Sequence, residues 1–497
     1  MKKALLGFAF AGICIGGFAQ PRKPFQYCAT PPEKSSWLER FQHTAVLLPR
    51  SIELLYVPLT VHLAGNTEGE GFIPISQVLD AFCTLNKHFA QAGIQFFIEG
   101  DIRYIRNTEF YDHATGEAGF RMMTQFNVSS TVNTYFVANA ANACGYNLRD
   151  RTGAGIGIAL SSSCTGMNTG AWAHEMGHYF SLPHTFHGWE NIEHNFSSPA
   201  PLLVNKIPVE MADGSNCRTA GDGFCDTPSD YLNGRWYCAN NDLSSIQQKD
   251  PYGIPFKSDG SLLMSYSGDP CPDRFSAEQI AAMRAHLQEK RPDHLKALPS
   301  APVSLREDVQ LLFPVPAAYV ATYDTVGMVW KTVQEADAYL VEISVVPTFA
   351  FTAHSYLTQD TFLMVYDLKP SRTYYWRLRP YNRFTACRNY SRVQSFITGS
   401  SNVTPTKELS RLSEAVVFPN PVHSGLSLSL DLESLEQREV RWTLTDLAGR
   451  TLSMGVLSAL PGKNRYHLEV PPLAPGTYFL QMREGKDGWI SKLIVLP

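Results

Sequence analysis

The order of apolar and polar residues in the first half of the chain predicts strands mixed with helices. Apolar runs rich in β-branched and aromatic side chains predict four strands, at residues 54–63, 94–98, 132–137 and 154–160. Residues 75–92 instead repeat apolar side chains at helical spacing, and a second helix is expected near Gly170. Strands interleaved with long helices, followed by a loop-rich stretch, predict an α/β or α+β domain over residues 51–298.

The pattern becomes all-β beyond residue 300. Short alternating strands separated by turn residues are predicted at residues 328–330, 338–343, 362–365 and 374–379. Residues 368–370, shortly before Tyr374, resemble the tyrosine corner of sandwich domains. Residues 302–399 therefore resemble a fibronectin type III module, which we expect to act as a spacer or docking surface. Residues 415–497 form a second β-rich unit, so we expect a multidomain chain in which two all-β, sandwich-like domains follow the mixed domain.

The N-terminus predicts export. A basic start, an apolar stretch at residues 4–16 and a small-residue site ending at Ala19 indicate a secretory signal peptide over residues 1–19. A lipoprotein signal ending at Cys14 is the alternative. Residues 20–50 are rich in proline and show little periodic pattern, which indicates a short pro-segment before the first strand.

Charge and composition exclude two classes of protein. The 497 residues include 42 Lys and Arg against 46 Asp and Glu, a formal net charge of −4. Electrostatic binding of nucleic acid needs a basic excess or stripe, so this class is excluded as the default. The hydrophobic share of 44% with 18% charged residues is that of a folded protein, which excludes a disordered chain. Outside the N-terminus no run of 18 apolar residues occurs, so no transmembrane helix is expected.

Cysteines are numerous enough to predict disulfides in an exported chain. The sequence has ten, and nine remain once Cys14 leaves with the signal peptide, so at least one thiol is expected to stay free. Four cluster between residues 217 and 271, and Cys28 stands alone in the pro-segment.

Residues 174–184, which read HEMGHYFSLPH, carry the candidate chemistry. On a helix, His174 and His178 lie one turn apart on one face, so both imidazoles can bind one ion. The chain must then turn back to bring His184 to the same ion. Three histidines leave a fourth position open for water, which is the catalytic arrangement of zinc and not the closed structural one. Glu175 is adjacent to the ion and can take a proton from that water.

This pattern resembles the elongated zinc signature of metzincin metallopeptidases. Residues 262–266 (LLMSY) resemble the Met-turn that lies beneath the zinc ion in that family. The resemblance implies that Met264 forms the floor of the site and that Tyr266 donates a hydrogen bond to the tetrahedral oxyanion. It also implies zinc ligands at His174, His178 and His184, with Glu175 as the general base.

Three further features point to the pappalysin family of metzincins, over roughly residues 51–290. They are Thr185-Phe186 after the signature, residues 221–228 (GDGFCDTP), and Cys271 after the Met-turn. The family has Gly where this chain has Ser181, and Ser costs about 1 kcal/mol or more in a left-handed turn. This departure leaves open that His187 or His194 supplies the third ligand.

The pappalysin resemblance also implies features of the loop-rich stretch. It suggests disulfides Cys217–Cys238 and Cys225–Cys271, although four cysteines allow three connectivities. In the same stretch Asp222, Asp226 and the carbonyl of Thr227 offer hard oxygen ligands that suit calcium. A polar turn without a metal ion is the alternative for these residues.

Latency is expected from Cys28. An extended pro-segment lying through the cleft could present this thiol to zinc at the open position, as in the cysteine switch of pappalysin relatives. The match is imperfect, since Ala29 stands where Gly is expected. The alternative is a disulfide of Cys28 with one of four others, namely Cys83, Cys144, Cys164 or Cys387. Activation would follow a cut within Pro49-Arg50-Ser51.

Residues 415–497 resemble the C-terminal sorting domain of the type IX secretion system. Four motifs occur in order: VFPNP at 417–421, LTDLAGR at 444–450, LAPGTYFL at 473–480 and KLIV at 492–495. The resemblance implies recognition by that secretion machinery, passage through the periplasm, and release to the cell surface or the medium.

Two functions are compatible with the sequence. The first is a secreted zinc endopeptidase made as a latent precursor, acting on polypeptides bound in extended form, with residues 154–160 as the candidate edge strand. The second is a surface adhesin whose peptidase domain has lost turnover. Intact Glu175 and Tyr266 favour the enzyme, because an inactive homologue has no chemical need for a base. Side-chain preference is not readable from the sequence.

Overall fold

The computed structural model describes most of the chain between residues 25 and 496. The described ranges are 25–43, 53–150, 153–239, 242–297, 305, 309–324, 326–366, 368–387, 390–401, 415–418, 422–423, 428–434, 437–446, 450–460, 462–468, 470–484 and 487–496. The expected signal peptide at 1–19 and the expected cut at 49–51 lie outside the described residues.

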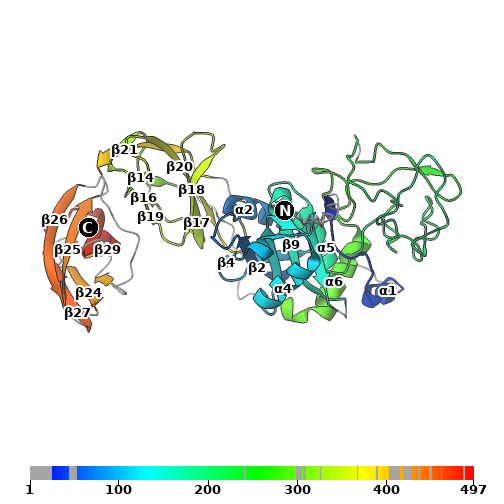
Figure 1. Ribbon diagram of the computed structural model, residues 1–497, viewed down its shortest axis with the longest axis horizontal. Helices are drawn as coiled ribbons and strands as arrows, with labels where there is room; N and C mark the ends of the chain where they lie inside the picture. Colours follow the sequence, from blue (N-terminus) through cyan, green and yellow to red (C-terminus); the bar gives the residue numbers. More distant parts are fainter. Residues whose placement is uncertain are drawn as a thin grey trace, which may run out of the picture.

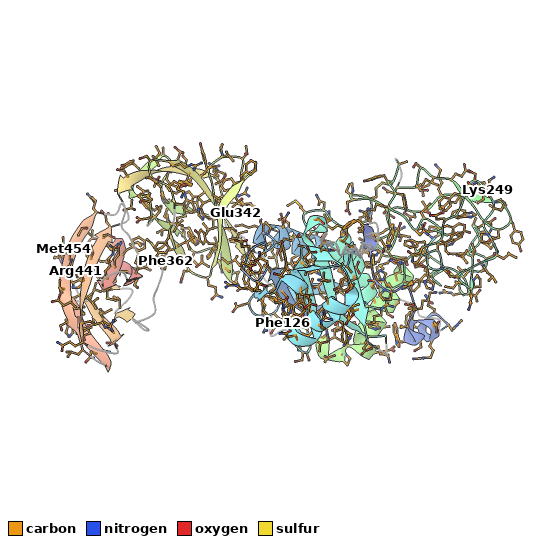
Figure 2. All side chains as sticks on the ribbon, in the orientation of Figure 1. Phe126, Lys249, Glu342, Phe362, Arg441 and Met454 are labelled. Carbon is orange, nitrogen blue, oxygen red and sulfur yellow. A yellow bond between two sulfur atoms is a disulfide. The ribbon has the colours of Figure 1, made fainter. Side chains whose placement is uncertain are left out.

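The molecule is multidomain and rich in β-structure. Figure 1 shows an elongated arrangement in which the mixed α/β part lies between a loop-rich part and two successive β-sheet parts. Lys249, in the loop-rich part, lies at the end of the molecule opposite the last β-strands (Figure 2). Among the described helices, none is long and apolar enough to cross a membrane.

A nine-stranded sheet organises the mixed part, in the order β3-β2-β6-β9-β8-β7-β5, with β4 on β2 and β1 on β8. Its strands are β1 Gln26–Cys28, β2 Leu55–Gly65, β3 Ile94–Ile98, β4 Arg103–Arg106, β5 Asp112–His113, β6 Val132–Val137, β7 Asn139–Ala140, β8 Ala143–Arg149 and β9 Gly155–Ser161. β2 pairs in parallel with β3 and β6, and β6 in parallel with β9. Parallel strands covered on both faces are continuously apolar, which explains the buried run of β2.

Helices cover this sheet. They are α2 Ile75–Phe89, α3 Thr108–Tyr111, α4 Gly116–Phe126, α5 Ala171–Tyr179 and α6 Ala277–Lys290, together with α1 Ser36–Gln42 from the pro-segment. α2 continues as a 3₁₀ turn to Ala92, so the helix expected at 75–92 and the four expected strands are confirmed to within two residues. Phe82 and Phe89 of α2 are fully buried against Phe96 and Trp172 in the main core.

The expected edge strand is wrong. β9 lies inside the sheet, because it pairs with β6 on one side and with β8 on the other. β7 pairs with β8 at a single position, and the pro-segment strand β1 pairs with β8 in parallel, Gln26 opposite Ala143 and Cys28 opposite Gly145. The strand that β1 extends is therefore β8 and not β9. Periodicity predicts that a strand exists but not its neighbours, which is why the sequence misplaced the edge.

The loop-rich part has only short strands among its described residues. They are β10 Leu203–Val204, β11 Ile207–Pro208, β12 Gln248–Lys249 and β13 Pro255–Phe256, which form two small hairpin pairs. Turns and side-chain hydrogen bonds hold most of the remaining backbone between α5 and α6.

The expected disulfide pairing in this part is also wrong. The structure has Cys217–Cys225 and Cys238–Cys271, with Cα–Cα distances of 5.1 and 6.4 Å, in place of Cys217–Cys238 and Cys225–Cys271. Both distances lie in the usual disulfide range. The bond from Cys217 to Cys225 closes a local turn. The spacing of the four cysteines in the sequence does not distinguish this pairing from the other two possible connectivities.

The other cysteines leave one free thiol among the described residues. The remaining disulfides are Cys83–Cys387 and Cys144–Cys164. Cys28 is free and buried, as the odd count predicted. The alternative in which Cys28 pairs with one of these four is therefore wrong.

The first β-sheet part is a sandwich of two sheets, β14-β16-β19 and β15-β21-β20-β17-β18. The strands are β14 Leu311–Phe313, β15 Ala318–Thr322, β16 Val326–Trp330, β17 Ala338–Ser344, β18 Thr352–Thr358, β19 Phe362–Val365, β20 Thr373–Tyr381 and β21 Gln394–Ser401. Trp330 and Trp376 fill the space between the sheets. The backbone N–H of Lys369 donates to Tyr374 Oη over 2.9 Å, at the expected tyrosine corner.

This sandwich is bound directly to the mixed part. Besides the disulfide Cys83–Cys387, the guanidinium of Arg379 forms a 2.6 Å ion pair with Asp80 of α2. Arg379 is buried, and Leu340 belongs to the same apolar cluster as the main core. The sandwich thus packs directly on α2 and β3. A spacer would not require this disulfide, this ion pair or a shared apolar cluster.

The last part also has two sheets, β22-β24-β27 and β23-β29-β28-β25-β26. Its strands are β22 Ala415–Phe418, β23 Val422–His423, β24 Leu428–Ser434, β25 Arg438–Asp446, β26 Thr451–Ala459, β27 Gly462–Leu468, β28 Gly476–Glu484 and β29 Asp487–Leu496. It has a separate apolar core that includes Leu430, Leu444 and Leu480.

Candidate metal centre

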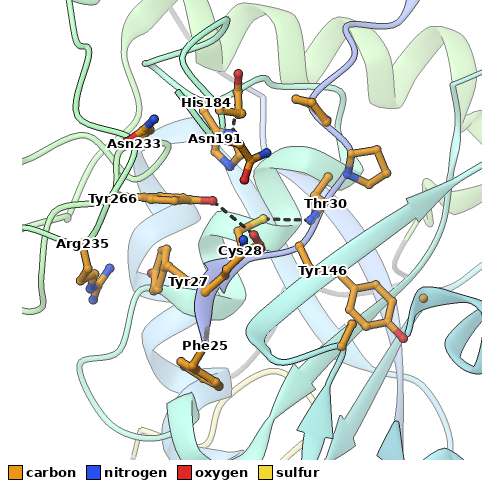
Figure 3. A pocket seen from close by; sticks show the side chains of 18 of the residues that line it. Phe25, Tyr27, Cys28, Thr30, Tyr146, His184, Asn191, Asn233, Arg235 and Tyr266 are labelled. Carbon is orange, nitrogen blue, oxygen red and sulfur yellow. Dashed lines mark hydrogen bonds and ion pairs between the residues drawn. The ribbon is translucent and has the colours of Figure 1, made fainter. Parts of the chain in front are cut away.

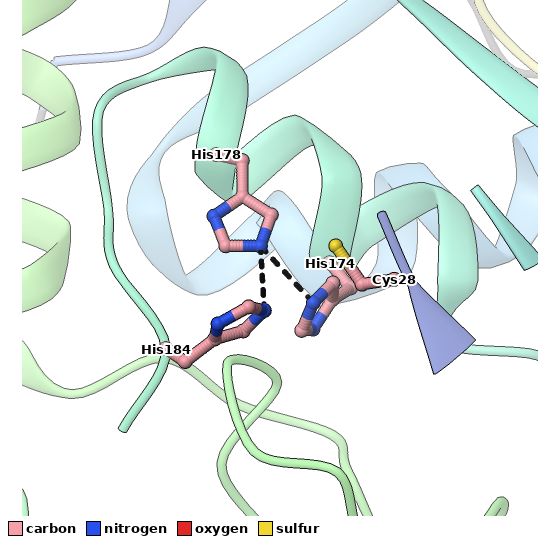
Figure 4. A group of neighbouring side chains, drawn as sticks. All are labelled: Cys28, His174, His178 and His184. Atoms are coloured by element: carbon pink, nitrogen blue, oxygen red, sulfur yellow. Dashed lines mark hydrogen bonds between the residues drawn. The ribbon is translucent and has the colours of Figure 1, made fainter. Parts of the chain in front are cut away.

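Three histidines converge at the C-terminal end of α5. The helix is buried along its whole length, and His174 and His178 lie one turn apart with their Nε2 atoms 3.2 Å from each other. The helix ends at Tyr179, and Ser181 adopts a left-handed conformation with φ of 81° that turns the chain back. His184 then places its Nε2 atom 3.1 Å from that of His178 (Figure 4).

The hydrogen bonds of the first two histidines define which ring nitrogen faces the cluster. His174 Nδ1 bonds to the carbonyl of Leu263 over 2.7 Å, and His178 Nδ1 to that of Leu182 over 2.8 Å. A carbonyl can only accept, so each Nδ1 carries the proton and each Nε2 presents a lone pair. Burial and repulsion from the neighbouring histidines lower the pKa of His174 and His178 well below the usual value, which keeps both rings neutral.

Facing lone pairs fit a bound cation. Two unprotonated nitrogens 3.1–3.2 Å apart repel each other unless a positive centre lies between them. Ligands about 2.0–2.1 Å from a tetrahedral zinc ion are themselves about 3.3–3.4 Å apart, close to the observed separations. The donor set therefore fits the metal that the sequence pattern implies.

Met264, the residue expected in the Met-turn, packs against α5 next to the helical histidines. It is fully buried, and a Cβ atom on Gly177 would overlap its sulfur atom. Gly177, the residue between the two helical histidines that faces the turn, is therefore required for this close approach. The neighbouring carbonyl of Leu263 orients His174, so the turn supports both the helix and its first histidine.

Glu175 lies beside the cluster and is 1% exposed. Burial raises the pKa of this carboxyl to about 7, while hydrogen bonds from Thr30 and Cys28 oppose the rise. Gly145 of β8 leaves room for the side chain, since a Cβ atom there would come within 2.9 Å of Glu175 Cγ. A carboxyl whose pKa is near neutrality is suited to accept and release a proton at physiological pH.

Glu190 supports the third histidine and was not identified from the sequence. Its carboxylate Oε1 lies 3.1 Å from His184 Nδ1, and Oε2 accepts a 2.8 Å hydrogen bond from the N–H of Gly188. The bond from His184 lowers the pKa of Glu190, against the opposing effect of burial. His184 is thus held by a carboxylate, whereas the other two histidines are held by backbone carbonyls.

Neither alternative third ligand joins the cluster. Among the described residues, the group whose side chains could bind one metal ion consists of Cys28, His174, His178 and His184. Their ligand atoms all lie within 4.8 Å of one another. His187 Nδ1 lies 3.9 Å from Glu190, and His194 packs against Trp189.

Cys28 reaches the histidines from β1, the position expected of it. The N–H of Thr30 donates to its sulfur over 3.3 Å, and Tyr266 Oη donates to its carbonyl over 3.3 Å (Figure 3). Burial, followed by the charge of Glu175, raises the pKa of the Cys28 thiol. A nearby metal ion would act in the opposite direction, because metal binding favours the thiolate.

Two other pro-segment residues contact the site and were not predicted. The Thr30 hydroxyl donates to Glu175 Oε2 over 2.8 Å and accepts from the N–H of Asn147 over 2.7 Å. The Tyr27 ring packs edge-on between His174 and Tyr266, with centroid distances of 5.2 and 5.3 Å. Both contacts join segments more than 100 residues apart, which local pattern cannot reveal.

A cavity of about 590 Å³ lies along the pro-segment beside the cluster. Residues 25–32 line it, together with residues that include His184, Glu190, Arg235 and Tyr266; Figure 3 shows several of them around Cys28. The guanidinium of Arg235 stacks 3.8 Å from the Tyr27 ring. The pro-segment thus occupies the space next to the histidines.

The expected calcium ligands are engaged by protein donors. Asp222 accepts from Thr227 Oγ1 at 3.0 Å and from the N–H of Phe224 at 2.9 Å. Asp226 accepts from Ser276 Oγ and from the N–H of Glu278, each at 2.7 Å, at the start of α6. Asp226 therefore caps a helix, and the described residues add no support for calcium.

Comparison with known proteins identifies the last part and relates the chain to extracellular metalloproteases. Residues 416–496 match the family described as secretion system C-terminal sorting domain. An extracellular metalloprotease of Neurospora crassa is 23% identical over 315 residues, which cover 59% of this chain and 98% of that protein. An extracellular metalloprotease of Arthroderma benhamiae is 26% identical over 255 residues, covering 48% and 80%.

Among solved structures, a human fibronectin type III domain is similar at 20% identity and a TM-score of 0.17, over 22% of this chain and 88% of that one. The sorting domain confirms the expectation for residues 415–497 and indicates export to the cell surface or the extracellular space.

Proposed function

We propose that this protein is a secreted zinc endopeptidase of the pappalysin type of metzincin, made as a latent precursor. The observation that carries the proposal is the convergence of three Nε2 lone pairs beside a buried carboxyl, Glu175. Similarity to extracellular metalloproteases along most of their length supports the reaction class. The close packing of Met264 against Gly177, between the two helical histidines, supports the metzincin subclass.

His174, His178 and His184 would hold the zinc ion. When bound, zinc polarises a peptide carbonyl and acidifies water. Glu175 acts as the general base that takes a proton from water and returns it to the leaving amine, a role that suits a buried carboxyl next to the histidines. Tyr266, released from the Cys28 carbonyl, is placed to donate to the oxyanion of the substrate.

Substrates bind as an added strand on β8. In the precursor β1 fills this edge, with the Ala29 N–H donating to the Gly145 carbonyl over 2.9 Å. An extended polypeptide can use the same backbone groups once β1 has left, which makes binding depend on main-chain hydrogen bonds more than on side chains.

Latency results from three contacts of the pro-segment. Cys28 occupies the open side of the histidine cluster, Thr30 bonds the base, and the Cys28 carbonyl accepts from Tyr266. Each catalytic group is thereby engaged before a substrate arrives. Activation requires that residues 27–30 leave the cleft.

Removing the base tests the proposal. The processed Glu175→Ala variant should lose nearly all hydrolysis of denatured protein while it keeps about one zinc ion per chain, because Glu175 is not a ligand. Glu193→Ala, an exposed change in the neighbouring loop, is the matched control. Mass spectrometry of the fragments gives the cleavage sites, and atomic absorption gives the zinc content.

Two results would contradict the proposal. Loss of zinc from Glu175→Ala would mean that the role of this residue is wrong. A zinc-loaded, processed wild type without any hydrolysis would favour the surface adhesin in place of the enzyme.

A further inference from the structure

The pro-segment contacts the mixed part at two places, and only the first is the metal cluster. After the exposed residues Pro31 to Glu33, the chain forms α1, which packs on α6 and on the loop at residues 221–223. None of the hydrogen-bond partners on these two elements belongs to the cluster of Cys28 and the histidines.

Apolar burial is the first part of this second contact. Trp37 is 6% exposed and Leu38 fully buried, and both belong to the main core. The Trp37 ring packs edge-on against His286 of α6 at 4.9 Å, and its indole N–H donates to Glu289 over 2.8 Å. A helix that places an indole inside the core contributes far more than surface contacts do.

Polar contacts are the second part of the contact between α1 and the rest of the protein. Lys34 Nζ donates to the Gly221 carbonyl over 3.1 Å, and Gln42 Nε2 to the Asp222 carbonyl over 2.8 Å. Burial lowers the pKa of the Lys34 ammonium, and the charges of Asp222 and Glu210 oppose this effect only in part. Glu210 Oε1 is itself buried without a hydrogen-bond partner among the described residues. The geometric contacts of Lys34 and Gln42 with residues 221–222 are therefore what the polar side contributes to the anchor.

Ser181 links the two places. Its hydroxyl lies 2.6 Å from that of Ser35, which also accepts the N–H of Leu38 as the N-cap of α1. The serine that replaces glycine in the zinc signature thus fixes the start of α1. The strained turn after the helical histidines gains a contact that glycine could not make.

The expected cut at residues 49–51 falls after α1, so it breaks none of these contacts. Before the cut, the tether keeps the segment at an effective concentration of the order of millimolar. After the cut, only the affinity of the segment itself holds it in place.

We infer that residues 34–42 form an anchor that binds the peptidase independently of the metal cluster, so that the severed pro-segment stays bound as a noncovalent inhibitor. The inference rests on the proposed function. Full activation then needs a second event, either dissociation of the anchor or a cut in the exposed stretch at 31–33 between the anchor and β1.

The test uses the complete precursor with a recognition site for a specific protease inserted between Arg50 and Ser51. After cutting, size-exclusion chromatography shows whether residues 20–50 co-elute with the remainder. Co-elution is expected for the wild type, for Cys28→Ala, and for Glu39→Gln, which changes an exposed position of α1. Trp37→Ala should release the segment, because its affinity falls by roughly 100-fold or more.

A second measurement covers the case in which the Trp37→Ala precursor does not fold. Synthetic peptides of residues 20–50, with and without Trp37→Ala, are titrated into the processed wild type, and binding is read by fluorescence anisotropy. Release of the wild-type segment on cutting, or equal affinity of the two peptides, would overturn the inference. Neither readout needs turnover, so a failure of the proposed enzyme activity would be seen separately.

Discussion

The hydroxyl of Thr30 donates a 2.8 Å hydrogen bond to Oε2 of Glu175, although 145 residues separate them in the sequence. The same hydroxyl accepts the backbone N–H of Asn147 on β8. Thr30 thus connects the segment that follows β1, the sheet edge and Glu175 in one chain of hydrogen bonds. Under the proposed mechanism, this segment occupies the general base as well as the metal cluster.

Loss of either blocking group should weaken latency. The uncut Cys28→Ala precursor is expected to hydrolyse denatured protein, and Thr30→Val should act in the same direction but less strongly, because Cys28 still fills the cluster. Ser36→Ala, an exposed change on α1, is the control. Rates of peptide release by the uncut proteins are the measurement, and a Cys28→Ala precursor as latent as wild type would refute the switch.

Tyr266 should affect turnover but not zinc. Replacing it with Phe is expected to lower kcat by about 10–1000-fold, the cost of losing one oxyanion donor, with zinc content unchanged. Tyr252→Phe, at a position 78% exposed, is the control. Steady-state kinetics of the processed enzymes decide the matter, and an unchanged kcat would remove Tyr266 from the mechanism.

Glu190 should tune zinc affinity. Glu190→Gln keeps an oxygen acceptor near His184 but removes the charge, so the dissociation constant for zinc should rise by about 10–100-fold, as for other residues that orient metal ligands. Chelator competition measures this constant without any substrate. An equal affinity in Glu190→Gln and in the exposed control Glu193→Gln would show that the carboxylate has no such role.

The contact between the mixed part and the first sandwich should stabilise both. Arg379→Ala leaves the partly buried carboxylate of Asp80 without its 2.6 Å partner, and a loss of about 3 kcal/mol is expected. Lys331→Ala, exposed on the same sandwich, should change little. Urea unfolding followed by tryptophan fluorescence gives the free energies, and parallel curves with equal midpoints would indicate a mere spacer.

His62 should make the fold sensitive to acid. Burial lowers the pKa of this ring to about 4, against about 6.5 in the unfolded chain. Between these two values the unfolded chain binds more protons, so stability falls as the pH falls from 6.5 towards 4, by at most about 3 kcal/mol. His62→Gln should remove this contribution. Free energies of unfolding of both proteins at pH 7, 5.5 and 4.5 provide the test, and an identical pH dependence would contradict it.

Local features of this protein were predicted well from the sequence. The spacing of His174 and His178 is fixed by one helical turn, and a helix does form there. Apolar runs such as the one at 94–98 became strands with the predicted bounds, because a strand buried on both faces needs a continuous apolar run.

Non-local features were predicted poorly. The edge strand was misplaced because the order of strands depends on how the whole sheet assembles. The disulfides were misassigned because the expected pairing followed the family resemblance, and the sequence alone cannot choose among the three connectivities of four cysteines. Nothing in the sequence indicated that Thr30 and Glu190 contact the site. Thr and Glu residues near a motif are common, and only the position in space gives these two a role.

The disulfide between Cys83 and Cys387 joins residues 304 positions apart and so sets an order of events during biogenesis. It cannot close until Cys387 has been synthesised and the chain has entered an oxidising compartment. Strand β1, by contrast, precedes every other strand of the sheet in the chain and is translated before them. The contacts of β1 need no covalent bond, whereas the covalent link between the mixed part and the first sandwich closes only after the chain has left the cytoplasm.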